Sequence, residues 1–326
     1  MDLSVFFAGT AGSVPTLRRG LPALLVRRGG DRLLFDCGEG TQRQLVRSVG
    51  LTELTEIFIT HFHADHWLGL PGLLKTFDLR GREQPLTIHG PAGLRELLAL
   101  ALRAAGRVKF ELELIELGRG DVLQRDGYRI APFPVSHRGP AFGYVLFEAE
   151  RPGVFDPRAA IELGLTPGPE FGQVQRGETI RGVTPERVMG APRPGRKLVM
   201  SGDTRPCETL GVAAHGADVL IHEATFAEEE RDRAAQTGHS TASQAAVVAR
   251  EAEVVMLALN HMSTRYAVGV LRDEARAIFP PTVLPRDFDT ITIPFAERGQ
   301  PELVRWNQRP PHPDPVPDEP VIDPPP

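Results

Sequence analysis

The sequence predicts an α/β protein, an αββα sandwich in which helices cover the outer faces of two β-sheets. Short apolar strands alternate with segments of helical periodicity from Met1 to about Phe147. A stretch rich in proline and glycine then interrupts this alternation, which resumes from Leu198 to about Pro294. Two β-rich halves of this kind suit two sheets that pack face to face beneath helices.

The first half is expected to contain eight strands and three helices. Apolar runs bounded by turn residues predict strands at residues 3–7, 23–26, 32–35, 57–59, 86–89, 110–115, 128–133 and 143–147. Apolar residues at helical spacing predict helices at residues 41–49, 68–77 and 93–104.

The stretch from Arg151 to Lys197 differs in composition from both halves. It holds seven prolines and a similar density of glycines, so regular packing is expected to be hard to sustain. Its eight positive and five negative side chains leave an excess of three positive charges. We interpret residues 151–197 as an inserted flexible arm, and a solvated linker that is basic by chance is the alternative.

The second half should repeat the pattern of the first. Strands are expected at residues 198–201, 219–222, 254–259 and 291–294, and helices at residues 241–252 and 266–278. Residues 301–326 hold ten of the chain's 30 prolines and few large apolar side chains, which predicts a disordered proline-rich tail. Residues 1–300 should therefore form one domain that carries the arm.

The composition excludes several classes of protein. No apolar run approaches the roughly 18 residues needed to cross a bilayer, and no leader pattern is visible, so we expect no membrane association. Cys37 and Cys207 lie far apart and form no metal-binding or disulfide pattern, which favours a reducing, cytoplasmic location. A formal charge of −5 argues against coating nucleic acid non-specifically but leaves room for a local basic surface.

Four potential metal ligands lie within six residues, directly after the strand predicted at residues 57–59. They are His61, His63, Asp65 and His66, in the pattern HxHxDH. Imidazole nitrogens and carboxylate oxygens without thiolates suit zinc, and manganese or iron would also fit them. A tight loop could aim His61 and His63 at one ion and the other two at a second. The length of the pattern disfavours the alternative, a surface histidine-rich loop without function.

One loop cannot complete a two-metal site, so further ligands must come from elsewhere in the chain. His137, Asp203 and His261 each follow a predicted strand. Taken singly, each would more often be a structural histidine or a turn aspartate. Together, and in this order after HxHxDH, they predict a shared metal site.

This order of ligands resembles the metallo-β-lactamase superfamily, and the resemblance spans about residues 1–300. It implies two zinc ions, one held by His61, His63 and His137, the other by Asp65, His66 and His261, with Asp203 bridging both. Two such ions would lower the pKa of a bridging water to give a hydroxide nucleophile, and would neutralise charge on a phosphate under attack.

Further motifs are similar to those of the ribonuclease Z family. They are FDCGEGTQ at residues 35–42, GLPGLL at 69–74, GPAFGY at 139–144, SGDTRPC at 201–207, HEATF at 222–226 and HST at 239–241. The last metal motif departs from the family pattern, because it reads NHMSTRY where a phenylalanine-containing HFSxRY is more usual. His261 itself is retained.

The resemblance implies a zinc-dependent endoribonuclease that cuts 3′ trailers from precursor tRNA, leaving a 3′-hydroxyl on the tRNA and a 5′-phosphate on the trailer. It also implies a homodimer in which the arm holds tRNA. Glu223 would orient His239, which would protonate the leaving oxygen, and Asp65 could handle the proton of the nucleophile. A structural Glu223–His239 pair, a hydrolase of small molecules on the same fold and a non-catalytic RNA-binding relative are the alternatives.

Overall fold

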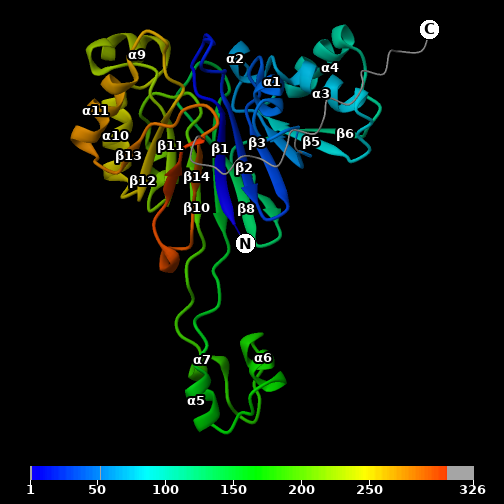
Figure 1. Ribbon diagram of the computed structural model, residues 1–326, viewed down its shortest axis with the longest axis vertical. Helices are drawn as coiled ribbons and strands as arrows, with labels where there is room; N and C mark the ends of the chain where they lie inside the picture. Colours follow the sequence, from blue (N-terminus) through cyan, green and yellow to red (C-terminus); the bar gives the residue numbers. More distant parts are fainter. Residues whose placement is uncertain (1, 52, 307–326) are drawn as a thin grey trace.

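Two β-sheets packed face to face form the body of the protein, with helices on both outer faces (Figure 1). The computed structural model describes residues 2–51 and 53–306. Within these residues one sheet has eight strands in the order β15-β14-β1-β2-β3-β4-β5-β6, and the other has seven in the order β13-β12-β11-β10-β9-β8-β7. This arrangement confirms the αββα sandwich expected from the sequence.

The eight-stranded sheet is built mainly from the first half of the chain. Its strands are β1 (Leu3–Gly9), β2 (Ala23–Arg28), β3 (Asp31–Phe35), β4 (Glu56–Phe58), β5 (Leu86–Gly90), β6 (Leu112–Glu116), β14 (Thr290–Thr292) and β15 (Glu302–Val304). The helices that accompany it are α1 (Thr41–Val46), α2 (Ala64–Trp67), α3 (Leu70–Leu79) and α4 (Leu94–Ala105).

The seven-stranded sheet is built from the centre and the second half of the chain. Its strands are β7 (Leu123–Arg125), β8 (Tyr128–Pro134), β9 (Phe142–Glu148), β10 (Lys197–Met200), β11 (Val219–Glu223), β12 (Met256–Asn260) and β13 (Thr282–Val283). Its helices are α8 (Glu208–Ala214), α9 (Arg231–Thr237), α10 (Ala242–Glu251) and α11 (Val268–Ile278), and short 3₁₀ turns are η1 (Glu228–Glu230) and η2 (Ala296–Arg298).

Strand β1 shows why the strands read as nearly continuous apolar runs. Val5 and Phe7 pack between the two sheets, whereas Phe6 packs beneath the outer helices. Successive side chains of a strand point to opposite faces, so a sheet covered on both faces needs apolar residues at every position. None of the helices among the described residues is long and apolar enough to span a bilayer.

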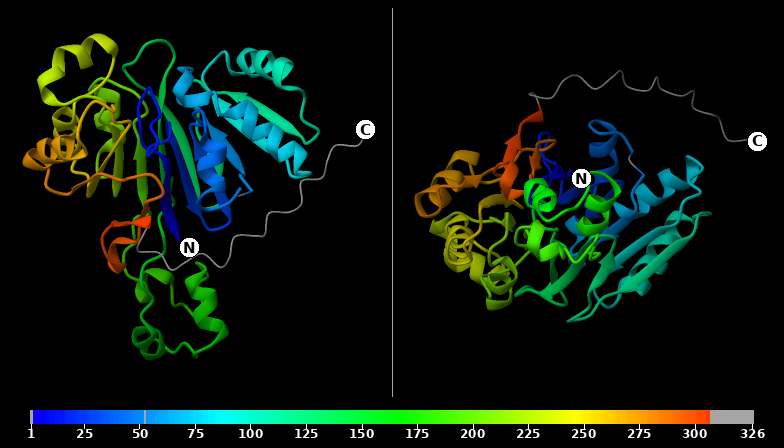
Figure 2. Two further views of the ribbon diagram at one scale, coloured as in Figure 1. Left: turned by 45° about the horizontal axis from the view of Figure 1, so that its top comes forward. Right: turned by 90° about the horizontal axis from the view of Figure 1, so that it is seen from below.

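The inserted stretch forms a small helical unit that projects from the body on two extended segments (Figures 1 and 2). Its helices are α5 (Pro157–Glu162), α6 (Pro169–Gln175) and α7 (Pro185–Val188). The expectation that regular packing would be hard to sustain here was wrong, because each helix begins with proline at a position where its missing N–H is not needed. Buried side chains join the helices into a core of their own: Ala160, Leu165, Val174, Val183 and Val188.

The net positive charge of the inserted stretch lies in its two extended segments rather than at its helical tip. Residues 155–189, which contain the three helices, hold four arginines and five carboxylates. The positive excess of residues 151–197 therefore comes from the two extended segments, which the sequence alone could not reveal.

The predicted disordered tail begins too early at residue 301. Glu302–Val304 forms strand β15, which pairs antiparallel with β14. Leu303 packs against the core between the sheets, and Trp306 packs against the core beneath the outer helices. These two side chains and the pairing with β14 together hold the segment against the body. The rest of the predicted tail, residues 307–326, lies outside the described residues.

Candidate metal centre

The predicted metal ligands meet at one edge of the sandwich because each follows a strand that ends there. The HxHxDH loop follows β4 and continues into α2, so that Asp65 and His66 lie in the first turn of a helix. His137, Asp203 and His261 follow β8, β10 and β12. The carboxyl ends of neighbouring parallel strands share an edge of the sheet, which explains how ligands distant in sequence converge.

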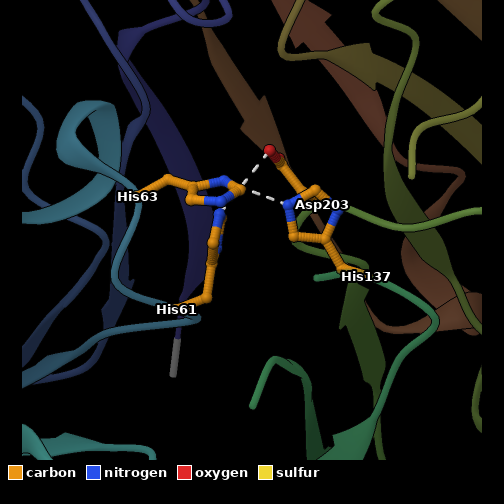
Figure 3. A group of neighbouring side chains, drawn as sticks. All are labelled: His61, His63, His137 and Asp203. Carbon is orange, nitrogen blue, oxygen red and sulfur yellow. Dashed lines mark hydrogen bonds and ion pairs between the residues drawn. The ribbon is translucent and has the colours of Figure 1, made fainter. Parts of the chain in front are cut away.

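Asp203 lies at the centre of this cluster, and its side chain is almost fully buried. Its Oδ2 atom is 3.2 Å from Nε2 of His261, 3.3 Å from Nε2 of His66 and 3.8 Å from Nε2 of His61. Nε2 of His137 lies 3.1 Å from Nδ1 of His63 (Figure 3).

The seven predicted ligands form two groups whose nitrogen and oxygen atoms lie within 4.8 Å of one another. The groups are His61, His63, His137 and Asp203, and Asp65, His66 and His261. Nε2 of His61 is buried and has no hydrogen-bond partner among the residues that the structure describes. An unpaired buried nitrogen is costly unless something else binds it, so its direction into the cluster fits a metal ligand.

Hydrogen bonds from outside the cluster fix which ring nitrogen of His66, His137 and His261 faces it. Nδ1 of His66 lies 2.7 Å from Oδ2 of Asp36, and Nδ1 of His261 lies 2.8 Å from the hydroxyl of Thr225. Nδ1 of His137 lies 2.7 Å from the Gly238 carbonyl oxygen. In each case Nε2 is left for a metal, as in zinc sites whose ligands are oriented by a second hydrogen bond.

Asp36 is a functional candidate that sequence reasoning missed. Its carboxylate accepts hydrogen bonds from the backbone and hydroxyl of Thr60 as well as contacting His66. It follows β3, which pairs in parallel with β4, and β4 leads to the HxHxDH loop. The sequence signal that could have identified Asp36 was its place in FDCGEG, directly after the strand that neighbours β4.

The loop after β1 closes another side of the cluster. The backbone N–H of Ser13 donates to Oδ2 of Asp65 at 2.7 Å. A side chain at Gly12 would meet the ring of His261, because a Cβ there would lie only 2.5 Å from Nδ1. Glycine is therefore required for the backbone to approach this histidine so closely.

The carboxylates and imidazoles of the cluster shift one another's pKa values. Burial alone would raise the pKa of Asp203. The neighbouring His261 and His66 outweigh burial and hold this pKa well below its usual value. Burial lowers the pKa of His66, but Asp203 and Asp36 outweigh burial and raise it well above normal. Burial lowers the pKa of His61, with the neighbouring His66 acting in the same direction. A cation would compete with protons for these nitrogens.

Glu223 and His239 form a pair beside the cluster. Oε1 of Glu223 lies 3.0 Å from Nδ1 of His239, and its other oxygen accepts from the Thr225 hydroxyl at 2.5 Å. Burial acts to lower the pKa of His239, but Glu223 outweighs it and raises this pKa to about 9. His239 is also near enough to Asp203 and His261 to complete a third metal-binding group. A cleft of about 340 Å³ beside it is lined partly by Phe226 and Arg265.

Comparisons with known proteins agree with this geometry. The family model of the metallo-β-lactamase superfamily matches residues 20–223. Ribonuclease Z of Methanosarcina acetivorans is 43% identical to this chain over 302 residues, which cover 90% of this chain and 99% of the relative. Ribonuclease Z of Myxococcus xanthus is 49% identical over 271 residues, which cover 81% and 88%.

A solved structure gives the same result. The crystal structure of the short form of human tRNase Z superposes with a TM-score of 0.67 and 29% sequence identity. The superposition covers 89% of this chain and 99% of the human one. We conclude that this chain belongs to the metallo-β-lactamase superfamily and, within it, to the ribonuclease Z family.

Proposed function

We propose that this protein is a zinc-dependent endoribonuclease that cuts the 3′ trailer from precursor tRNA. The products would be a tRNA with a 3′-hydroxyl and a trailer with a 5′-phosphate. The observation that carries this proposal is the convergence of six nitrogen and oxygen ligands around a seventh, Asp203, in a chain of the ribonuclease Z family. A non-catalytic RNA-binding relative would not need this complete set.

The donor set supports two zinc ions per chain. His61, His63 and His137 would hold one ion, Asp65, His66 and His261 the other, and Asp203 would contact both. The unpartnered Nε2 of His61 and the absence of thiolates from the set fit zinc, while manganese or iron would also accept these donors. When bound, such ions supply Lewis acidity for water activation and neutralise charge on the attacked phosphate.

His239 is proposed as the proton donor to the departing 3′ oxygen. Its Nδ1 faces Glu223, which leaves Nε2 for the substrate and favours the protonated ring at neutral pH. Glu223 would act by orienting the ring, in the manner of the carboxylate of a catalytic triad. Asp65 would assist with the proton of the nucleophile as well as binding metal.

The projecting arm supports a substrate larger than a nucleotide. Its helices lie well away from the body, so they can contact a folded RNA only if that RNA spans the distance to the metal centre (Figure 1). We propose precursor tRNA as that RNA and a homodimer as the active form, because the relatives named above are a ribonuclease Z and a tRNase Z. A hydrolase of small molecules would have no use for the arm.

The test is incubation of zinc-loaded protein with a precursor tRNA that carries a 3′ trailer, followed by analysis of both new ends. We expect one cut near the discriminator base, a 3′-hydroxyl on the tRNA and a 5′-phosphate on the trailer. Asp65→Ala should abolish the cut. An intact precursor, together with hydrolysis of small phosphodiesters or esters, would refute the tRNA assignment and favour a small-molecule hydrolase.

A further inference from the structure

The root of the arm is tied to the segment that follows β14. The carboxylate of Glu297, in η2, accepts hydrogen bonds from Nη1 and Nη2 of Arg151 at 2.7 and 3.0 Å, and from Nη1 of Arg193 at 3.0 Å. The guanidinium carbon of Arg151 also lies 3.5 Å from the centre of the Phe295 ring. We call Arg151, Arg193, Phe295 and Glu297 the clasp.

A buried ion cluster anchors the two arm segments below the clasp. Arg196 is 3% exposed and donates to both oxygens of Glu148, at 2.7 and 2.8 Å. It also donates to the Ile293 carbonyl oxygen at 2.8 Å, and its guanidinium lies 4.1 Å from the Phe295 ring. Arg28 of β2 completes the cluster with a 2.8 Å hydrogen bond to Glu148. The points where the arm leaves and re-enters the body are therefore fixed.

At the clasp and beyond it, the backbones of the two segments are hydrogen-bonded to each other. The backbones of Arg151 and Arg193 exchange two hydrogen bonds of 2.8 Å, and the Gly190 N–H donates to the Val154 carbonyl oxygen at 2.9 Å. A Cβ at Gly153 would lie only 1.8 Å from the Gly190 carbonyl oxygen, so the segments approach as closely as glycine permits. The arm is a narrow ribbon with a packed helical tip, and its direction must be set at the root.

We propose that the clasp is a positioning device that fixes the angle at which the arm leaves the body, and that Glu297 and Phe295 thereby control the affinity for precursor tRNA. This inference rests on the proposed function. Arg151 and Arg193 would hold Glu297 rather than RNA phosphates, so two of the positive charges that make the arm appear basic are already engaged. A fixed angle reduces the ordering that tRNA binding would otherwise require.

The clasp can be opened without unfolding the body. The Arg151–Glu297 pair lies at the surface, with side chains 21% and 39% exposed, and such pairs add little to global stability. Glu297→Ala and Phe295→Leu should therefore fold, and Phe295→Tyr should keep the ring above the arginines. Glu302→Ala is the matched control, because it removes one exposed carboxylate from the neighbouring strand β15.

The first experiment separates KM from kcat for precursor tRNA. We expect Glu297→Ala and Phe295→Leu to raise KM about 5- to 10-fold with little change in kcat, since only arm alignment is lost. Phe295→Tyr and Glu302→Ala should behave as wild type, and all four variants should hydrolyse a small phosphodiester normally. Unchanged KM in both clasp variants, or a parallel loss of small-substrate activity, would overturn the proposal.

The second experiment measures arm direction without any RNA. Spin labels at Arg176→Cys on the arm and Arg103→Cys on α4, in a Cys207→Ser background, report the distance between tip and body. We expect a single narrow distribution in the clasped protein and a clearly broader one after Glu297→Ala. If the distribution does not broaden, the clasp does not position the arm, whereas broadening in a protein that leaves precursor tRNA uncut would refute the proposed function alone.

Discussion

At the scale of single residues, His239 distinguishes a catalytic site from a site that only binds metal, because its proposed role is to donate a proton. Nδ1 of its ring lies 3.0 Å from Oε1 of Glu223, and the raised pKa of His239 favours the protonated ring at neutral pH. A 3′ oxygen leaves poorly as an alkoxide, whereas a nitrophenolate leaves readily without a proton. The rate of cleavage should therefore depend on His239 strongly when the leaving group is a 3′ oxygen and weakly when it is a nitrophenolate.

We expect His239→Ala to slow precursor cleavage by about 100-fold or more, because the leaving oxygen loses its proton donor. Hydrolysis of bis(p-nitrophenyl) phosphate by the same variant should fall far less. Single-turnover rates on both substrates, with zinc content measured in parallel, provide the check. An equal loss on both substrates would instead assign His239 to metal binding, as its proximity to Asp203 and His261 would allow.

A substitution at Asp36 can measure how much the hydrogen bond behind His66 contributes to metal affinity. Asp36→Asn keeps the shape and an acceptor for Nδ1 of His66, but removes the charge that strengthens this ligand. We expect zinc affinity to fall about 10-fold, measured by competition with a chelator. Affinity equal to that of the wild type would show that Asp36 serves only to hold Thr60.

At the scale of elements, a largely buried triad of polar side chains lies between the two sheets. Glu56 of β4 contacts His89 of β5 at 2.6 Å and donor groups of Arg125 of β7 at 2.5 and 2.8 Å. His89 is fully buried and stacks on Phe58, so it serves packing as well as the contact with Glu56. The triad joins strands of different sheets.

The triad gives a pH dependence of defined sign. Burial acts to raise the pKa of Glu56, but Arg125 and His89 outweigh it and lower this pKa to about 2 from 4.5. A lowered carboxyl pKa stabilises the fold above pH 4.5, and this contribution of about 3 kcal/mol is lost as pH falls from 4.5 towards 2. Glu56→Gln should therefore lower the free energy of unfolding at pH 7, with the difference from wild type shrinking in acid.

Urea unfolding of the metal-free protein between pH 7 and pH 3 measures this difference, because chelation removes the effect of metal loss in acid. His89→Gln serves as a control for packing of the buried ring. A difference between Glu56→Gln and wild type that stays constant with pH would contradict the assignment.

Elements with a pattern inside one short segment could be predicted from the sequence. Elements that depend on contacts with distant segments were missed. HxHxDH and the strands that carry it could be identified because alternation and ligand spacing lie within one short segment. The helices of the arm were missed, since their core of small and branched residues follows no single periodic run. Strand β15 was missed because its order depends on pairing with β14. Asp36 and the clasp likewise depend on residues far away in sequence.

At the scale of the whole molecule, the arm and the candidate metal centre are separate parts, and under the proposed function one precursor tRNA would contact both. The arm projects from the end of the body opposite α2, which follows the HxHxDH loop, as expected for an insertion between the end of β9 and the start of β10 (Figure 1). In a homodimer, the arm of one subunit could hold tRNA that is cut by the other.

Mixing two inactive variants tests this arrangement. A protein lacking residues 155–189 keeps its metal centre, and Asp65→Ala keeps its arm. We expect each alone to cut precursor tRNA poorly and the mixture to recover a substantial part of wild-type activity, because hybrid dimers combine one intact arm with one intact centre. A mixture no more active than the sum of its parts would indicate that arm and centre act within one chain.

The most direct test of the central claim is a zinc titration of the metal-free protein, with the initial rate of precursor tRNA cleavage as the readout. We expect the rate to rise from near zero and to reach its plateau at two zinc ions per chain, with single cleavage near the discriminator base. Cleavage by the metal-free protein at the full rate, or an intact precursor at saturating zinc, would contradict a two-zinc tRNA endonuclease.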